Sequence, residues 1–238
     1  MSDHRSRAEA EIPATHYLGD YNGKGRFISY WHQIDEVLKR DPQFILEVGI
    51  GNQFLADFLR NTGKSIITAD INPALLPDVV SSIDALPFAD QMFDMVISCE
   101  VLEHLPLASL KGALQELHRV TSKWAVLSVP NCTRCYCLQV PIPKVGLLRR
   151  QWELPAPRNH ALIPDHSWEI GHAGVSEQQL VEYFRQTGFT VEVSYRVFEH
   201  PYHHFFVLAR EQHTEVNSDN ESYRQENARN GTFLANRL

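Results

Sequence analysis

A glycine turn lies between two apolar runs that each end in an acidic residue. The run Phe44–Leu46 ends at Glu47, and Gly49 and Gly51 follow it. Because glycine lacks a Cβ atom, such a turn lets a ligand approach the backbone closely. The next apolar run ends at Asp70, where a parallel βαβ unit places a carboxylate for ribose hydroxyls. This spacing indicates a nucleotide-like ligand.

Further acids and histidines follow the later apolar runs. Asp84 follows a short run at 78–83, which places it beside the glycine turn. The segment Glu100-Val-Leu-Glu103-His104 follows an almost continuously apolar stretch, as expected for a strand covered on both faces. A loop farther along contains His166, Glu169 and His172.

The surrounding pattern alternates apolar runs with helical periodicity, which predicts an α/β fold with a parallel sheet. A helix over 27–38 leads into the sheet, and its aromatic residues are expected to be core more often than site residues. The last two runs are expected to pair as an antiparallel hairpin. The expected strands are 44–46, 65–69, 78–83, 93–99, 124–129, 189–198 and 205–210, and the expected helices are 27–38, 54–61, 107–117 and 176–186.

Length and composition favour one domain with mobile ends. The chain has 238 residues, of which 43% are hydrophobic, enough for one sizeable core. We expect disordered segments at 1–16 and 211–238 around a domain at 17–210. The net charge of −7 argues against an electrostatic grip on nucleic acid. No apolar run of about 18 residues predicts a membrane span, and no signal-peptide core is present, so we expect a cytoplasmic protein.

Residues 132–172 form an irregular, proline-rich insertion that we expect to be a lid. Its cluster of Cys132, Cys135 and Cys137 lacks a second CxxC pair, so free thiols are favoured over a zinc site. The segment VPIPKVGLLRRQW mixes apolar and basic residues and could touch a membrane surface or an amphiphilic acceptor, although a lid is the preferred interpretation. The sequence gives no prediction of oligomeric state.

In their order along the chain, these motifs resemble the Rossmann-like class I S-adenosylmethionine-dependent methyltransferases. The resemblance rests on LEVGIGN, TADIN, SSIDALPFADQMFDMVISCEVLEHL and LSVPN. It implies a three-layer sandwich with a mostly parallel seven-stranded sheet and an antiparallel closing hairpin. It departs from the family at Gln53, where many members have a third glycine, and at 121–123, where a Pro-Gly-Gly turn is usual. A nicotinamide-binding protein is disfavoured because the glycine pattern breaks and IDALPF has no role there.

The resemblance also implies roles for individual residues. S-adenosylmethionine would be the cofactor, with its methionine part near the glycine turn, its ribose on the acid of TADIN and its adenine near the acid of IDALPF. A small-molecule methyl acceptor would lie under the lid, and we place catalytic candidates in the order His166, His172, Glu169, against the alternative that these side chains only stabilise the lid. The expected cofactor-binding residues are Glu47, Gly49, Gly51, Asp70, Ile71, Asp84, Ala85 and Cys99.

Two alternatives remain. Glu100, Glu103 and His104, with His166, resemble the divalent-metal set of small-RNA terminal 2′-O-methyltransferases, in which the metal orients an acceptor hydroxyl and lowers its pKa. The same EVLEHL segment also occurs in metal-free relatives. A non-catalytic cofactor-binding module is the other alternative, and it is disfavoured because Asp70 and both glycines are present.

Overall fold

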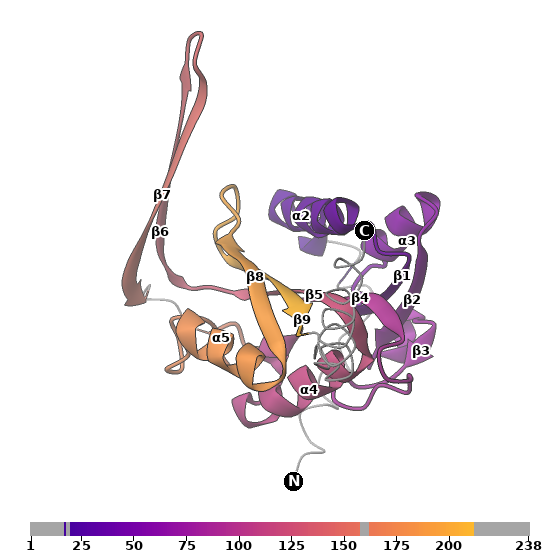
Figure 1. Ribbon diagram of the computed structural model, residues 1–238. Coiled ribbons are helices and arrows are strands. Elements are labelled where there is room, and N and C mark those ends of the chain that lie inside the picture. The colour runs from indigo at the N-terminus through magenta and orange to yellow at the C-terminus, as the bar shows by residue number, and fades with distance from the viewer. Residues whose placement is uncertain (1–16, 18–19, 158–161, 212–238) are drawn as a thin grey trace, which may run out of the picture.

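The computed structural model describes residue 17 and residues 20–157 and 162–211 (Figure 1). Its main sheet has seven strands in the order β3-β2-β1-β4-β5-β9-β8. Strands β1 to β5 pair in parallel, and β9 runs antiparallel to both β5 and β8. The predicted sheet and its closing hairpin are therefore confirmed. The strands are β1 (Phe44–Val48), β2 (Ser65–Asp70), β3 (Val79–Val80), β4 (Phe93–Cys99), β5 (Thr121–Pro130), β8 (Phe189–Arg196) and β9 (His203–Arg210).

Helices cover both faces of this sheet, which gives the predicted three layers. Helices α2 (Lys24–Arg40) and α3 (Phe54–Asn61) pack on one face, and α4 (Leu110–Val120) and α5 (Glu177–Gln186) pack on the other (Figure 1). Each layer contributes its own apolar cluster. Short 3₁₀ segments connect the larger elements: η2 (Asp20–Asn22), η3 (Pro73–Leu75), η4 (Leu102–His104) and η5 (Leu107–Ser109).

The glycine turn after β1 sets the start of α3. Gly49 and Gly51 have φ angles of 83° and 51°, and Gln53, which precedes α3, also lies in the left-handed region at 63°. Glycine at position 53 would adopt the left-handed conformation without strain. In this chain the residue is Gln53, and a hydrogen bond of its side chain accompanies that conformation. The Gln53 side chain donates to the carbonyl of Leu75 at 2.6 Å. The departure from the family motif thus ties the turn to the segment after β2.

Helix α2 buries only part of the apolar face that its spacing predicts: Tyr30 and Val37 are buried. The apolar residues Phe27, Trp31 and Leu38 are 47%, 59% and 53% exposed. The buried side of the helix also includes polar residues, among them Glu36, whose carboxylate pairs with Arg40 at 2.5 Å. A buried carboxylate with a cationic partner can replace an apolar residue at such a contact.

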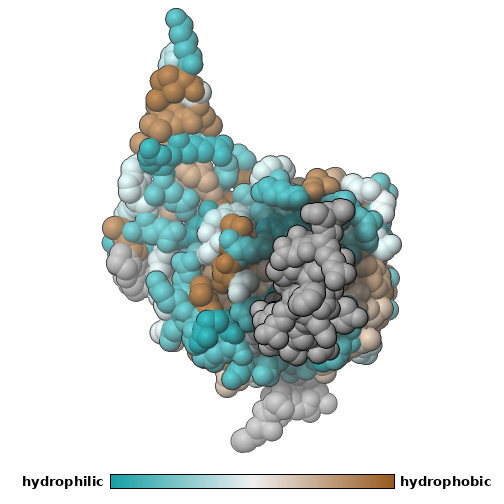
Figure 2. All heavy atoms as spheres, viewed as in Figure 1, coloured by the Kyte–Doolittle hydropathy of each residue, from teal (hydrophilic) through white to brown (hydrophobic). Residues whose placement is uncertain are grey.

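Residues 132–172 differ most from the prediction. Strands β6 (Thr133–Ile142) and β7 (Gly146–Pro157) form a separate antiparallel sheet, the ribbon, which projects from the body (Figure 1). Hydrophobic residues gather on it below a hydrophilic tip (Figure 2). A free two-stranded ribbon accepts prolines such as Pro141, because its outer edges need no hydrogen-bond partner.

The predicted disordered segments, 1–16 and 211–238, lie outside the described residues except for residue 211. That residues 17–210 form a single domain stays a prediction. In the part of the chain that is described, no helix is long and apolar enough to cross a bilayer.

Candidate active site

A cavity of about 300 Å³ lies at the carboxyl ends of the parallel strands, where open α/β sheets bind their ligands. Its walls come from the glycine turn, the end of β2, the segment after β3 and the end of β4. Tyr21 and Arg26 close one side, and the segment 163–166 and the β8–β9 connection close another. Of the predicted cofactor residues, the cavity lining includes Gly49, Gly51, Asp70, Ile71 and Cys99.

The cofactor end of this cavity is built by Gly49 and Asp70. A Cβ atom at Gly49 would lie 2.2 Å from Cγ2 of Val101, so only glycine fits here. Asp70 accepts the backbone N–H groups of Ile50 at 2.9 Å and Asn72 at 2.8 Å. Burial raises the pKa of this carboxyl group, and those N–H groups partly oppose the rise. Asp70 therefore holds the loops on both sides of the cavity in place.

Glu47 lines a smaller side cavity that adjoins the glycine turn. Burial raises its pKa to about 8, and its Oε2 atom has no hydrogen-bond partner among the described residues. A buried acceptor without a partner is costly unless a ligand satisfies it.

The segment after β3 presents backbone and a serine rather than the predicted acid. Ser81 and Ile83 line the cavity, and Oγ of Ser81 is buried without a hydrogen-bond partner in the described part of the chain. Asp84 and Ala85 are exposed and are not among the lining residues. The turn directs their side chains outward, and their contact with a cofactor stays a prediction.

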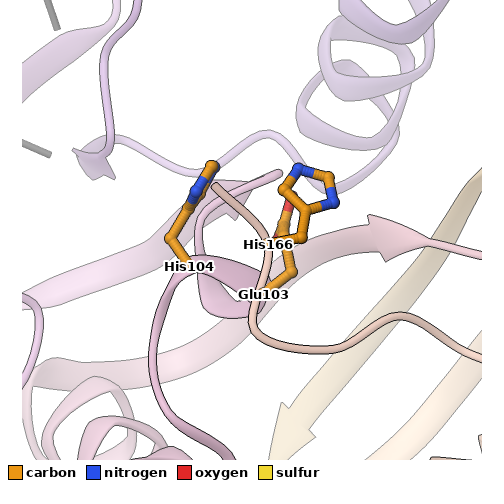
Figure 3. Close-up of side chains that lie close together, drawn as sticks. All are labelled: Glu103, His104 and His166. Atoms are coloured by element: carbon orange, nitrogen blue, oxygen red, sulfur yellow. The ribbon is translucent and has the colours of Figure 1, made fainter. Parts of the chain in front are cut away.

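Three side chains that line the same cavity converge (Figure 3). One ligand atom from each of Glu103, His104 and His166 lies within 4.8 Å of the others. The two imidazole rings are nearly perpendicular, with centroids 5.0 Å apart. Glu103 is fully buried and, within the described residues, neither of its carboxylate oxygens accepts a hydrogen bond. Burial, and next the charge of Glu100, raise the pKa of Glu103 well above its usual range.

Glu100 lies beside this group but has partners of its own. It accepts a hydrogen bond from Ser128 at 2.7 Å, and its Oε2 lies 3.4 Å from Nε2 of His203. Its φ of 59° is unusual for a residue other than glycine, and such strain clusters at functional sites. Burial raises its pKa, while the nearby Arg26 opposes the rise. Three of the four expected metal residues are thus brought together, and Glu100 stands next to them.

The three catalytic candidates take different positions. His166 lines the cavity, and its Nδ1 lies 2.9 Å from Oε1 of the fully buried Glu169. The same oxygen accepts a hydrogen bond from Tyr202 at 2.8 Å. Glu169 therefore fixes the His166 ring and leaves Nε2 for other contacts. His172 is not among the cavity-lining residues.

Comparison with known proteins agrees with this architecture. Residues 46–129 match a family model described as a methyltransferase domain. This segment of the chain is similar to the S-adenosylmethionine-dependent methyltransferases. S-adenosylmethionine is the methyl donor of these enzymes. No curated protein matches this methyltransferase in sequence.

Solved structures share the fold of this methyltransferase at low identity. Magnesium protoporphyrin IX methyltransferase from Synechocystis PCC 6803, with bound S-adenosylmethionine, has a TM-score of 0.55 and 13% identity over 79% of this chain and 80% of that chain. A chain from the Haloferax volcanii complex with the Trm112 methyltransferase activator has a TM-score of 0.57 and 15% identity over 88% and 99%. A methyltransferase from Aquifex aeolicus has a TM-score of 0.54 and 14% identity over 84% and 100%.

Several cavity residues of the methyltransferase were not predicted. Arg26 lies over the Tyr21 ring at 4.2 Å, and Tyr202 and His203 enter from the β8–β9 connection. Their neighbours across the cavity are distant in sequence, so spacing alone gives no signal for them. The turn-rich, aromatic segment at 17–26 was the one available indication.

Proposed function

We propose that this methyltransferase transfers a methyl group from S-adenosylmethionine to a small-molecule acceptor bound beside His166. The observation that carries the proposal is the cavity itself, which both the glycine turn and His166 line. Methyl transfer is an in-line displacement that mostly requires positioning and exclusion of water. The cavity brings several of the predicted cofactor residues and His166 into one site.

The residues present fit the cofactor. The Gly49 cradle admits a ligand where any side chain would collide with Val101. Oε2 of Glu47 and Oγ of Ser81 are buried acceptors that a bound ligand would satisfy. We assign Glu47 to the ammonium of the methionine part and Asp70, with Ile71, to the ribose. Asp84, Ala85 and Cys99 complete the proposed adenine side of the site.

His166 is the proposed acceptor-side group. Its position at the cavity wall and its hydrogen bond to Glu169 suit a group that receives a proton from the acceptor. Glu169 acts through the ring that it orients, so we propose it as a positioning residue. His172 lies outside the lining and is the weakest of the three candidates.

The test combines calorimetry with an acceptor screen. The wild-type chain should bind S-adenosylhomocysteine and methylate at least one small acceptor. His166→Asn should lose methylated product, by about 10²-fold or more, and keep product-cofactor affinity. His172→Asn is the matched control and should keep both. Absence of S-adenosylhomocysteine binding by the wild type would sink the proposal, and equal activity of the two variants would remove His166 from the mechanism.

A second candidate function is favoured by the Glu103, His104 and His166 group. Carboxylate and imidazole ligands suit several divalent cations, and the three ligand atoms already lie within 4.8 Å of one another. We propose, as the alternative, metal-assisted methylation of a hydroxyl such as a ribose 2′-OH, with Glu100 as the fourth ligand. The cation would supply Lewis acidity that lowers the acceptor pKa. The chain charge of −7 weighs against a nucleic-acid acceptor.

Metal content and activity separate the two candidates. Under the alternative, the purified enzyme binds Mn²⁺ or Mg²⁺ in proportion to protein, and Glu103→Gln removes both metal and activity while S-adenosylhomocysteine still binds. Activity that survives chelation at an undiminished rate removes the metal candidate and leaves the first proposal standing. We propose the cytoplasm as the place of action.

A further inference from the structure

The ribbon formed by β6 and β7 is amphipathic. Residues directly opposite in an antiparallel pair point to the same face, so the register Tyr136↔Trp152, Leu138↔Arg150 and Val140↔Leu148 assigns one face. Six large apolar residues on it are between 38% and 55% exposed. This apolar face consists of Tyr136, Leu138, Val140, Leu148, Trp152 and Leu154.

The opposite face turns toward the body. Arg149 pairs with Glu199 at 3.1 Å and lies 5.3 Å from the Phe198 ring centroid. Glu153 lies 3.8 Å from the guanidinium of Arg196, whose side chain is fully buried. These contacts hold this face against the end of β8 and the β8–β9 connection, so the apolar face points away from the domain. An isolated two-stranded hairpin is marginal in water, and an exposed apolar patch of this kind marks an interaction site.

Charge restricts the partner. The ribbon carries four basic residues, Arg134, Lys144, Arg149 and Arg150, and one acid, Glu153, whereas the whole chain has a net charge of −7. Arg134 and Arg150 lie on the apolar face, and Glu153 lies on the other. The partner must therefore combine apolar surface with negative charge.

A second copy of the chain does not meet this requirement. In a twofold dimer the apolar face would contact itself. Arg134 and Arg150 would then be buried against a surface without a carboxylate, which is costly.

The outer part of the ribbon distinguishes a lipid surface from an acidic protein. Below the hydrophilic tip, the second face also carries an apolar pair, because Pro141 lies opposite Leu147 on the side that carries Arg149 nearer the base (Figure 2). Val145 in the turn is 79% exposed. A protein partner covers one face, whereas lipid surrounds an inserted segment on all sides. Trp, Tyr and Arg flanking aliphatic residues are typical of the membrane interface.

We propose that the ribbon docks this protein onto an anionic membrane surface. The apolar face enters the interface, and Arg134 and Arg150 meet lipid phosphates. Lys144 at the turn extends its ammonium back to the headgroups, so the ribbon lies along the interface. The proposal is independent of the function proposed above.

Vesicle co-sedimentation without cofactor tests the proposal. The full chain should bind vesicles of phosphatidylcholine with phosphatidylglycerol, bind phosphatidylcholine alone far more weakly, and release as salt is raised. Arg150→Gln should weaken partitioning about fivefold, and Leu148→Ser about tenfold or more. Leu76→Ser is the matched control, because Leu76 is 78% exposed and precedes β3 at the opposite edge of the sheet.

Tryptophan fluorescence is a second measurement, which keeps the test valid if a substitution unfolds the ribbon. Trp152→Phe should keep vesicle binding and lose the fluorescence quenching that brominated lipids cause in the wild type. All variants should keep the unfolding temperature of the body. Absence of binding to anionic vesicles, or equal binding by Arg150→Gln, Leu148→Ser and the wild type, overturns the proposal. A dimer in sedimentation velocity that Leu148→Ser dissociates also overturns it and assigns the face to a second copy.

Discussion

Replacing Glu47 with glutamine should stabilise the fold in a pH-dependent way. Burial raises the pKa of Glu47 from 4.5 to about 8. Folding therefore favours the protonated form. The loss of folding stability that Glu47 causes is absent below about pH 4.5, grows as the pH rises to about 8 and is constant above that. At about 1.4 kcal/mol per pH unit, the gap corresponds to on the order of 5 kcal/mol.

Urea unfolding of both proteins between acidic and mildly alkaline pH measures this effect. The advantage of Glu47→Gln in unfolding free energy should be small at the acidic end, rise through the window and then level off. Glu177→Gln is a control of opposite sign, because the His204 hydrogen bond lowers the pKa of Glu177 to about 2. The Glu177 contribution is present above about pH 4.5 and is lost as the pH falls toward 2, so Glu177→Gln should be destabilising at neutral pH. A pH-independent difference for Glu47→Gln would refute the reasoning.

The Glu47 carboxyl group also links protonation to cofactor binding. At pH 7 a group with a pKa near 8 is mostly protonated, so an ammonium bound beside Glu47 should displace close to one proton. Calorimetric titration with S-adenosylhomocysteine in two buffers of different ionisation enthalpy measures that proton. Identical binding heats in both buffers would contradict the assignment of Glu47 to the ammonium.

Two further predictions concern packing. Gly49→Ala should abolish detectable S-adenosylhomocysteine binding in calorimetry, because its Cβ would lie 2.2 Å from Val101 at a φ of 83°. Adding Val101→Ala to this variant should restore binding in part. Unimpaired binding by Gly49→Ala would show that the turn does not hold the cofactor. Arg196→Met should lower the free energy of unfolding by about 3 kcal/mol or more, because the guanidinium donates to the carbonyls of Pro201 and Asn131. Urea titration measures this loss, and a loss below about 1 kcal/mol would contradict the prediction.

The parts of the fold that follow from local pattern were predictable. The glycine turn and the helix at 176–186 each depend on neighbours in sequence, and the structure confirms them. The length of β3 was wrong because only Val79 and Val80 find ladder partners on β2. A strand at the sheet edge has one neighbouring strand, so its length is limited to the residues that hydrogen-bond to that neighbour.

The ribbon and the far wall of the site could not be read from local pattern. Alternation in β6 and β7 emerges only when the two strands are paired, since Leu138 and Arg150 share a face across the register. Arg26 and His203 reach the cavity from segments that are distant in sequence. His166 was predictable because its loop follows a strand whose carboxyl end lies at the site, whereas His172 in the same loop turns away from it.

Binding of S-adenosylhomocysteine to the wild type and to Asp70→Ala tests whether this cavity holds the cofactor. Asp70 lines the cavity and accepts two backbone N–H groups from the loops that frame it. Calorimetry should show one cofactor per wild-type chain and at least about a hundredfold loss of affinity in Asp70→Ala, equivalent to about 2.7 kcal/mol. Asp70→Asn, which keeps one accepting oxygen, should lie between them. Absence of binding by the wild type, or unchanged affinity in Asp70→Ala, would contradict the account.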